Sequence, residues 1–244
     1  GENESNEVRI RVSPVDLRKK NAEEFINRVM ESLQKHKLPF GYSVAVTRKD
    51  IRVVTSDKFI DMFIKKGALI DWYFLYTPIG KTPDLSLMPT PKQRLYLKKR
   101  RDHIRANKPL FIIDFWNDAP YVGGCIAAKD YIHINHRGEV ESCIFTHFAQ
   151  VNIKNTSLKE AMNCQFFKEI RKRQPYSDNL YLPCMLIDHP QVSRELYQKC
   201  DIYLTHEGAE ILFFNLAEGL DKYSKGVKNI YREVWEKEKG WMKK

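Results

Sequence analysis

Three cysteines carry the most specific chemical signal in this sequence. Cys125 is followed by twelve residues, then Gly138, then four residues, then Cys143. Cys184 follows later, in a segment that reads Leu-Pro-Cys-Met. Cysteine thiolates ligate both iron–sulfur clusters and zinc. The pattern predicts a metal site at these cysteines, and three interpretations stay open: an iron–sulfur cluster, a zinc site, or buried structural thiols without a metal.

A hairpin explains the spacing of the first two cysteines. Residues 131–135 and 139–142 have the pattern of two short strands, and Gly138 lies in the turn between them. Such a hairpin folds back on itself, so we expect it to bring Cys125 and Cys143 to one end of the strand pair. A third thiolate from Cys184 would then fasten the hairpin to a later loop.

A fourth ligand is left open by the sequence. The candidates are an imidazole, a carboxylate, another thiolate, or an iron left open to substrate, and the residues concerned are His147, Asp188, His189 and Cys200. Cys164 lies in a helical stretch, where core packing is favoured over ligation.

The cysteine pattern and its flanking residues resemble the auxiliary-cluster domain of radical S-adenosylmethionine enzymes, in its twitch or SPASM form. The flanks that carry this resemblance are Tyr131-Ile132-His133-Ile134, Gly138-Glu139-Val140, Cys143-Ile144-Phe145, Asn152-Ile153, residues 157–161 and Phe166-Phe167. The resemblance implies an auxiliary 4Fe-4S cluster held by Cys125, Cys143 and Cys184. It also implies that the intact family fold binds S-adenosylmethionine, while the substrate, a peptide or a small molecule, stays unknown.

Two pairs of residues are candidates for contact with S-adenosylmethionine. Thr47-Arg48 and Tyr76-Thr77 follow two successive predicted strands. In parallel barrels the carboxyl ends of the strands face the active site. The resemblance therefore implies that Thr47, Arg48, Tyr76 and Thr77 approach the cofactor, with ordinary polar strand ends as the alternative.

The chain departs from the family in one motif. The family's catalytic cluster uses a Cys-x3-Cys-x2-Cys loop, and these 244 residues contain none. We therefore leave open whether the chain is an enzyme, and expect it to be inactive alone. The first half of the barrel would come from a missing N-terminal part or from a partner chain, with one short edge strand expected at residues 8–12.

The fold class expected is α/β. Helix and strand patterns alternate over residues 22–114, which predicts βα units and a parallel sheet. Residues 1–117 are interpreted as a segment of a partial (βα) barrel, and residues 118–244 as a small α+β auxiliary-cluster domain with the hairpin and C-terminal helices. The expected helices span residues 22–36, 56–67, 91–105, 157–162, 165–173 and 191–239, the last with a break near 205–208; the expected strands of the parallel sheet span 42–47, 71–77 and 110–114.

Two rival functions stay open beside this resemblance. The net charge is +10, with basic residues spread along the chain, so a basic nucleic-acid-binding module is one rival function. A noncatalytic iron–sulfur or zinc-binding partner protein is another. The five cysteines and the polar start favour a reducing compartment, hence the cytoplasm. No apolar run approaches the roughly 20 residues of a membrane helix, so no membrane partner is expected.

Overall fold

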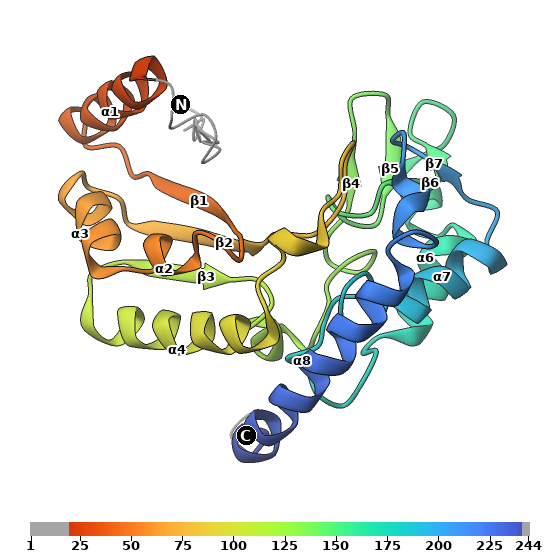
Figure 1. Cartoon of the computed structure of the whole chain (residues 1–244). Helices are drawn as coiled ribbons and strands as arrows, with labels where there is room; N and C mark the ends of the chain where they lie inside the picture. The colour runs from red at the N-terminus through yellow and green to blue at the C-terminus, as the bar shows by residue number, and fades with distance from the viewer. Residues whose placement is uncertain (1–19, 241–244) are drawn as a thin grey trace. The chain divides into compact units, whose positions relative to one another are not determined.

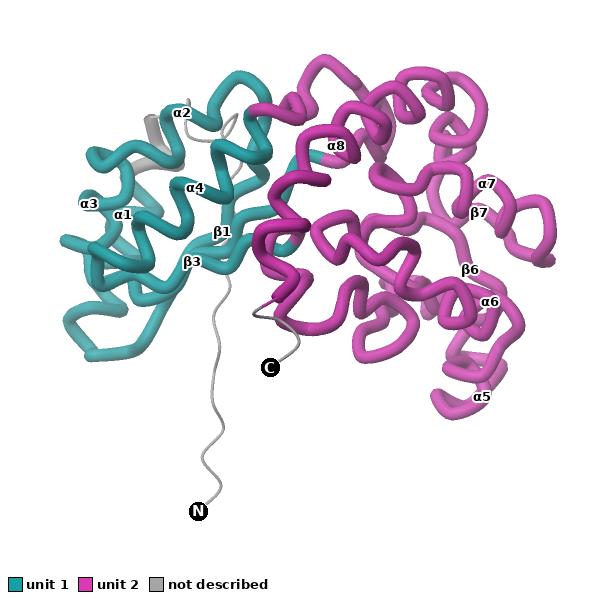
Figure 2. The backbone as a smooth tube through the Cα atoms, turned by 90° about the horizontal axis from the view of Figure 1, so that it is seen from below, with its two compact units in different colours: residues 1–76, 93–115 teal, residues 77–92, 116–244 magenta. Residues whose placement is uncertain are grey.

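A computed structural model describes residues 20–240, and the chain divides into two compact units. The first unit comprises residues 1–76 and 93–115, and the second comprises residues 77–92 and 116–244. Figure 2 shows the two units in different colours. The expected strand at residues 8–12 lies outside the described residues.

The first unit is a parallel α/β layer. Its elements in chain order are α1 (Lys20–Lys35), β1 (Gly41–Val46), α2 (Ile51–Val54), α3 (Asp57–Lys65), β2 (Ile70–Leu75), α4 (Pro91–Asn107) and β3 (Phe111–Asp114). The strands lie in the order β1-β2-β3, and both pairs are parallel. Figure 1 shows α2, α3 and α4 beside the strands. The predicted parallel sheet of βα units is confirmed, and its three described strands form an open sheet rather than a closed barrel.

Alternation along β2 shows how the sequence builds this layer. Asp71, Tyr73 and Leu75 are buried, while the residues between them are half-buried. Side chains of a strand point to opposite faces in turn, so one face of β2 lies in the core. Val46 of β1 and Ile112 of β3 are also fully buried and belong to the same core.

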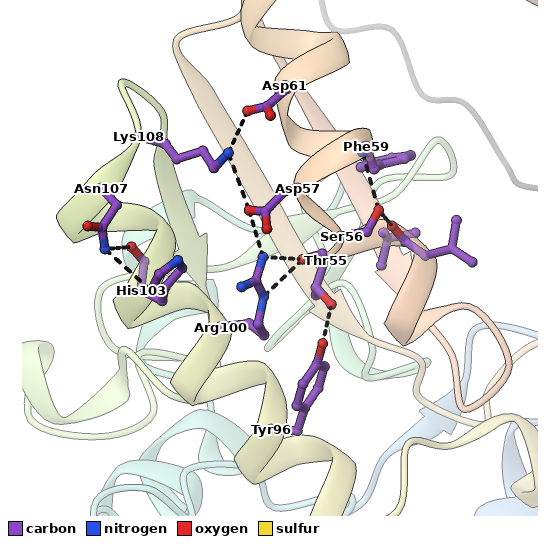
Figure 3. Close-up of polar contacts among 12 residues, drawn as sticks. Thr55, Ser56, Asp57, Phe59, Asp61, Tyr96, Arg100, His103, Asn107 and Lys108 are labelled. Atoms are coloured by element: carbon purple, nitrogen blue, oxygen red, sulfur yellow. Dashed lines mark hydrogen bonds and ion pairs between the residues drawn. The ribbon is translucent and has the colours of Figure 1, made fainter.

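Polar contacts hold the helices of this unit to one another. Ser56 caps α3 by accepting a hydrogen bond from the Phe59 amide, because serine at a helix start can bind a free backbone N–H. Arg100 of α4 donates to the Thr55 carbonyl at 2.8 Å and to Asp57 at 3.1 Å (Figure 3). Lys108 reaches Asp61 at 2.6 Å in the same view. These contacts fasten α4 to the start of α3.

The second unit combines a small antiparallel sheet with helices. Its strands are β4 (His133–Ile134), β5 (Glu139–Glu141), β6 (Phe148–Asn152) and β7 (Tyr203–Leu204), and its helices are α5 (Leu158–Met162), α6 (Gln165–Arg173), α7 (Pro190–Lys199) and α8 (Ala217–Glu238). The sheet order is β4-β5-β6-β7, antiparallel throughout. The predicted hairpin is confirmed as β4–β5, and the α+β character of this unit agrees with the expected fold class. The pairings with β6 and β7 were not predicted.

The C-terminal region differs from the single helical stretch expected over residues 191–239. Two helices occupy it, α7 and α8, and they are separated by residues 200–216. That interval contains β7 and a short 3₁₀ helix at Ala209–Leu212, so the interruption is longer than the expected break near residues 205–208. The sequence of β7 is too short to show a strand pattern of its own.

Neither compact unit is a single continuous stretch of the chain. Residues 77–92 belong with the second unit, although they precede most of α4 in the sequence. The division into domains of residues 1–117 and 118–244 stays a prediction. None of the described helices has both the length and the apolar composition needed to cross a lipid bilayer.

Candidate metal centre

The hairpin places Cys143 close to the segment that follows Cys125. The Ala128 amide donates to the Ser142 carbonyl at 3.1 Å, one residue before Cys143. Gly138 adopts a φ of 86°, a left-handed conformation that favours glycine, and thereby closes the turn. Two segments on either side of the hairpin are thus joined at its open end, as the spacing predicts.

The three predicted thiols share one electrostatic environment. Burial raises the pKa of Cys143 to about 12, and the charge of Cys125 adds to this. Burial also raises the pKa of Cys184, and the charges of Asp188 and Cys125 raise it further. Such electrostatic effects require short distances between the groups concerned. Cys184 therefore lies near the hairpin cysteines although it is remote from them in sequence.

Tyr176 is a buried residue in the loop between α6 and α7, and all three cysteines act on it electrostatically. Burial raises the pKa of its hydroxyl first, and the charges of Cys125, Cys184 and Cys143 raise it further. The hydroxyl is buried and has no hydrogen-bond partner among the described residues. This buried hydroxyl therefore lies near all three sulfurs.

An open pocket adjoins the first cysteine. It has a volume of about 270 Å³ and is lined by Gly123, Cys125, Lys129, Arg171, Gln174 and Pro175. Gln174 donates to the Ala127 carbonyl at 2.9 Å, and Arg171 donates to the Ala128 carbonyl at 2.7 Å. Both side chains therefore hold the backbone that follows Cys125, beside a pocket of positive character.

A tight turn positions Cys184. Its carbonyl accepts hydrogen bonds from the amides of Asp188 and His189, both at 3.0 Å. Its own amide donates to Asp188 Oδ2 at 3.0 Å. The hydroxyl of Ser224, in α8, donates to the Asp188 carbonyl. The turn is therefore tied at both ends, and the Asp188 carboxylate lies beside the Cys184 backbone.

All three cysteines are free thiols, and thiolates ligate both iron–sulfur clusters and zinc. Within residues 20–240, no three His, Cys, Asp or Glu side chains lie close enough together to hold one metal ion. Thiolates of an iron–sulfur cluster bind different iron atoms, so they surround a larger object and need not meet at one point. Cys125 acts electrostatically on both Cys143 and Cys184, which places one thiol near each of the other two.

Apart from Asp188, the sequence left three residues as candidates for a fourth ligand, and their surroundings differ from one another. His147 packs edge-on against His206, with ring centroids 5.2 Å apart. Cys200 is buried, and its pKa is raised by burial and by the charge of Glu169. Cys164 is also buried, as the preference for core packing predicted. His189 is buried beside the turn of Cys184, and its Nε2 lies 3.0 Å from the Leu182 carbonyl.

The candidate S-adenosylmethionine residues follow the strands as expected. The Tyr76 amide donates to the Val46 carbonyl at 2.9 Å, so the chain leaves β1 and β2 at the same edge. Thr47 has its hydroxyl engaged locally, accepting hydrogen bonds from the Lys49 and Asp50 amides at the start of α2. Arg48 is exposed, and Thr77 is buried and is the first residue of the second unit. Their contact with the cofactor stays a prediction.

Sequence reasoning missed the residues that surround the sulfurs. Gln174 and Tyr176 lie in a loop between α6 and α7, and only their proximity in sequence to Cys184 could have pointed to them. Trp116 and Asn117, which follow β3, are both buried. Asn117 accepts a hydrogen bond from the Tyr231 hydroxyl at 2.6 Å.

Comparisons with known proteins bear on this site. Residues 125–186 match the model of the SPASM iron–sulfur cluster-binding domain, and this span contains all three cysteines. The solved structure of hexahistidine-tagged anSMEcpe with bound AdoMet is similar to this chain, with a TM-score of 0.49 and 16% sequence identity. The similarity covers 84% of this chain but only 59% of the other chain. No curated protein is significantly similar in sequence. The SPASM match confirms the predicted auxiliary-cluster domain.

Proposed function

We propose that this chain is a radical S-adenosylmethionine-type protein whose residues 125–186, which match the model of the SPASM iron–sulfur cluster-binding domain, hold an auxiliary 4Fe-4S cluster through Cys125, Cys143 and Cys184. The observation that carries the proposal is the shared environment of the three thiols, in which the charge of Cys125 acts on both other sulfurs. The cluster supplies electron transfer or a site for substrate, in a protein whose substrate is a peptide or a small molecule.

The chain prepares these sulfurs for ligation. Burial raises the pKa of each thiol, which disfavours free thiolates. Backbone amides oppose this effect, because Ala127 hydrogen-bonds Cys125, Phe145 and Ile144 hydrogen-bond Cys143, and Ile187 and Leu186 hydrogen-bond Cys184. Hydrogen bonds to the sulfurs of a cluster also tune its reduction potential. The amides thus partly offset the effect of burial on the pKa of all three thiols.

Anaerobic reconstitution tests the proposal. The chain should bind about four iron atoms and four sulfides and show the brown absorbance of a 4Fe-4S cluster. Replacing Cys125, Cys143 or Cys184 with Ala should each remove most of the bound iron. Zinc bound in stoichiometric amount, with no iron after reconstitution, would contradict the assignment and favour the zinc-binding alternative.

Cys164→Ala is the matched control for these variants. Cys164 is a buried cysteine of the same unit, and its pKa responds to burial, Arg171 and Lys168 rather than to the three proposed ligands. Its replacement should leave iron and sulfide content unchanged. A loss of iron as large as that of Cys143→Ala would show that the assay reports folding rather than ligation.

A further inference from the structure

The antiparallel sheet of the second unit carries a group of histidines around a buried carboxylate. Glu141 of β5 is buried, and Nδ1 of His133 in β4 donates to its Oε2 at 2.6 Å. His147 directly precedes β6, and His206 lies two residues beyond the end of β7. We call His133, Glu141, His147 and His206 the histidine cluster. Because the sheet order is β4-β5-β6-β7 (Figure 1), each strand or its end supplies one member.

Thr205 joins β7 to the rest of the histidine cluster. Its hydroxyl donates to Glu141 Oε1, and its amide donates to the His147 carbonyl at 3.0 Å. Its own carbonyl accepts a hydrogen bond from Arg137. The strand β7 is only Tyr203–Leu204, and it lies at the edge of the sheet, where it pairs with β6. The contacts of Thr205 therefore contribute much of what holds this edge.

We propose that residues 203–206 are a pH-sensitive latch on the edge of this sheet, closed while His147 is neutral and released when His147 takes up a proton. All members of the histidine cluster belong to the second unit. The proposal goes beyond the proposed function and does not depend on which metal the cysteines bind.

The closed latch has no hydrogen-bond acceptor for a charged His147. Its Nε2 is buried and has no hydrogen-bond partner among the described residues. A protonated imidazole carries an N–H on both nitrogens, and a buried charge without a partner costs free energy. The carboxylate of Glu141 already accepts hydrogen bonds from His133, from Thr205 and, at 3.3 Å, from Asn135. Release of residues 203–206 would admit water to the imidazole, so the charged form favours the released state.

The charges around His147 act mostly in the same direction. The His206 ring packs edge-on against it, and His206 Nδ1 donates to the Glu207 carbonyl at 2.6 Å. Burial lowers the pKa of His147, and the charges of His206 and His133 lower it further, while Glu141 opposes them. The other charged or titratable groups around the histidine cluster are Arg137, Glu139, His136, Tyr203 and Glu207. A second imidazolium beside His206 would therefore add repulsion.

The direction of the pH effect follows from this lowered pKa. An unfolded or released His147 has the ordinary histidine pKa of about 6.5, and the closed latch lowers it. The stability of the closed latch is therefore complete above about pH 6.5 and is lost as pH falls toward the lowered pKa. In that window the released fraction should rise about tenfold for each pH unit.

Hydrogen exchange of the full, iron-reconstituted chain tests the latch between pH 7.5 and pH 5.5. After correction for the intrinsic pH dependence of exchange, the protection of amides 203–206 should fall by up to about tenfold between pH 6.5 and pH 5.5. The amides of β1, in the first unit, should keep their protection. His147→Gln cannot take up a proton in this range, so its protection at 203–206 should not change with pH. Iron is determined at each pH, and variants are compared at equal iron content.

His136→Gln is the matched control, because His136 is an exposed histidine of the same hairpin. It should retain the wild-type fall in protection. Constant protection in the wild-type chain, or an equal fall in His147→Gln, overturns the latch. A fall that disappears in His136→Gln assigns the effect to the hairpin turn and overturns it too. If His147→Gln does not fold, His147→Phe, which keeps a ring against His206, decides in the same way.

Discussion

Asp71 is a carboxyl group buried in the first unit, far in sequence from the cysteines. It is fully buried, and neither of its oxygens has a hydrogen-bond partner among the described residues. Burial raises its pKa well above the usual range, although the nearby hydroxyls of Tyr42 and Tyr73 partly oppose this. Those hydroxyls lie close to the carboxyl without meeting the geometry of a hydrogen bond. Asp71 is therefore neutral in the folded chain over a range of pH where it ionises in the unfolded chain.

We expect Asp71→Asn to remove a pH-dependent loss of stability. The folded-state pKa is raised, so the stabilising contribution is complete below the unfolded-state pKa of about 3.9 and is lost as pH rises toward the folded-state pKa. In that window the loss is about 1.4 kcal/mol per pH unit. Urea unfolding of both proteins from about pH 4 to pH 7 measures the difference in free energy of unfolding. A difference that does not change with pH would contradict the expectation.

The β4–β5 hairpin depends on a glycine at its turn. A Cβ at position 138 would lie 2.8 Å from Asn152 Oδ1, and the φ of 86° is unfavourable for any residue with a side chain. Gly138→Ala should cost about 1–3 kcal/mol of unfolding free energy and reduce iron uptake, because the hairpin holds Cys143. Chemical unfolding and iron analysis of the reconstituted chain measure the two effects.

Gly80→Ala is the control for this element. Gly80 has a similar φ of 91°, but a Cβ there would meet no atom within 4 Å. It should lose only the part of the stability that comes from backbone conformation, and it should keep its iron. Equal losses in the two variants would show that the contact with Asn152 contributes nothing.

At the scale of the whole molecule, the two units should respond differently to cluster removal. All three proposed ligands lie in the second unit, and none lies among the β1, β2 and β3 strands. Metal binding contributes to the folding of the region that supplies the ligands. We expect hydrogen exchange of residues 125–186 to accelerate after chelation of iron, while exchange in β1–β3 stays slow. Mass spectrometry of both states measures this, and equal acceleration in both units would refute it.

The chemistry of the whole chain is also testable. Its 244 residues contain no Cys-x3-Cys-x2-Cys loop, the motif whose cluster delivers an electron to the sulfonium of S-adenosylmethionine in the family that the sequence resembles. We expect the reconstituted, dithionite-reduced chain to form no 5′-deoxyadenosine above a control without protein. Formation of this product at a rate that depends on protein concentration would show that the chain is catalytic by itself.

The sequence by itself determined the elements whose signals are local. The Ser56 cap, the apolar periodicity of α3 and the buried strand at β2 each depend on neighbouring residues, so the pattern predicts them directly. The cysteine pattern around Gly138 is local in the same sense, because one hairpin generates it. The parallel sheet followed from the alternation of such local elements.

Tertiary structure alone decided which distant segments meet. The pairing of β6 with β7 joins residues more than fifty positions apart, and each strand is short. Tyr176 and Asp188 reach the neighbourhood of Cys125 only through packing of the loops around α6, α7 and α8. Such contacts arise from many weak interactions summed over the folded unit. The residues that neighbour each contact in sequence therefore give no local pattern that predicts it. The sequence therefore predicted the three thiols as ligands and left the fourth ligand open, whereas only the fold brought Tyr176 and Asp188 near Cys125.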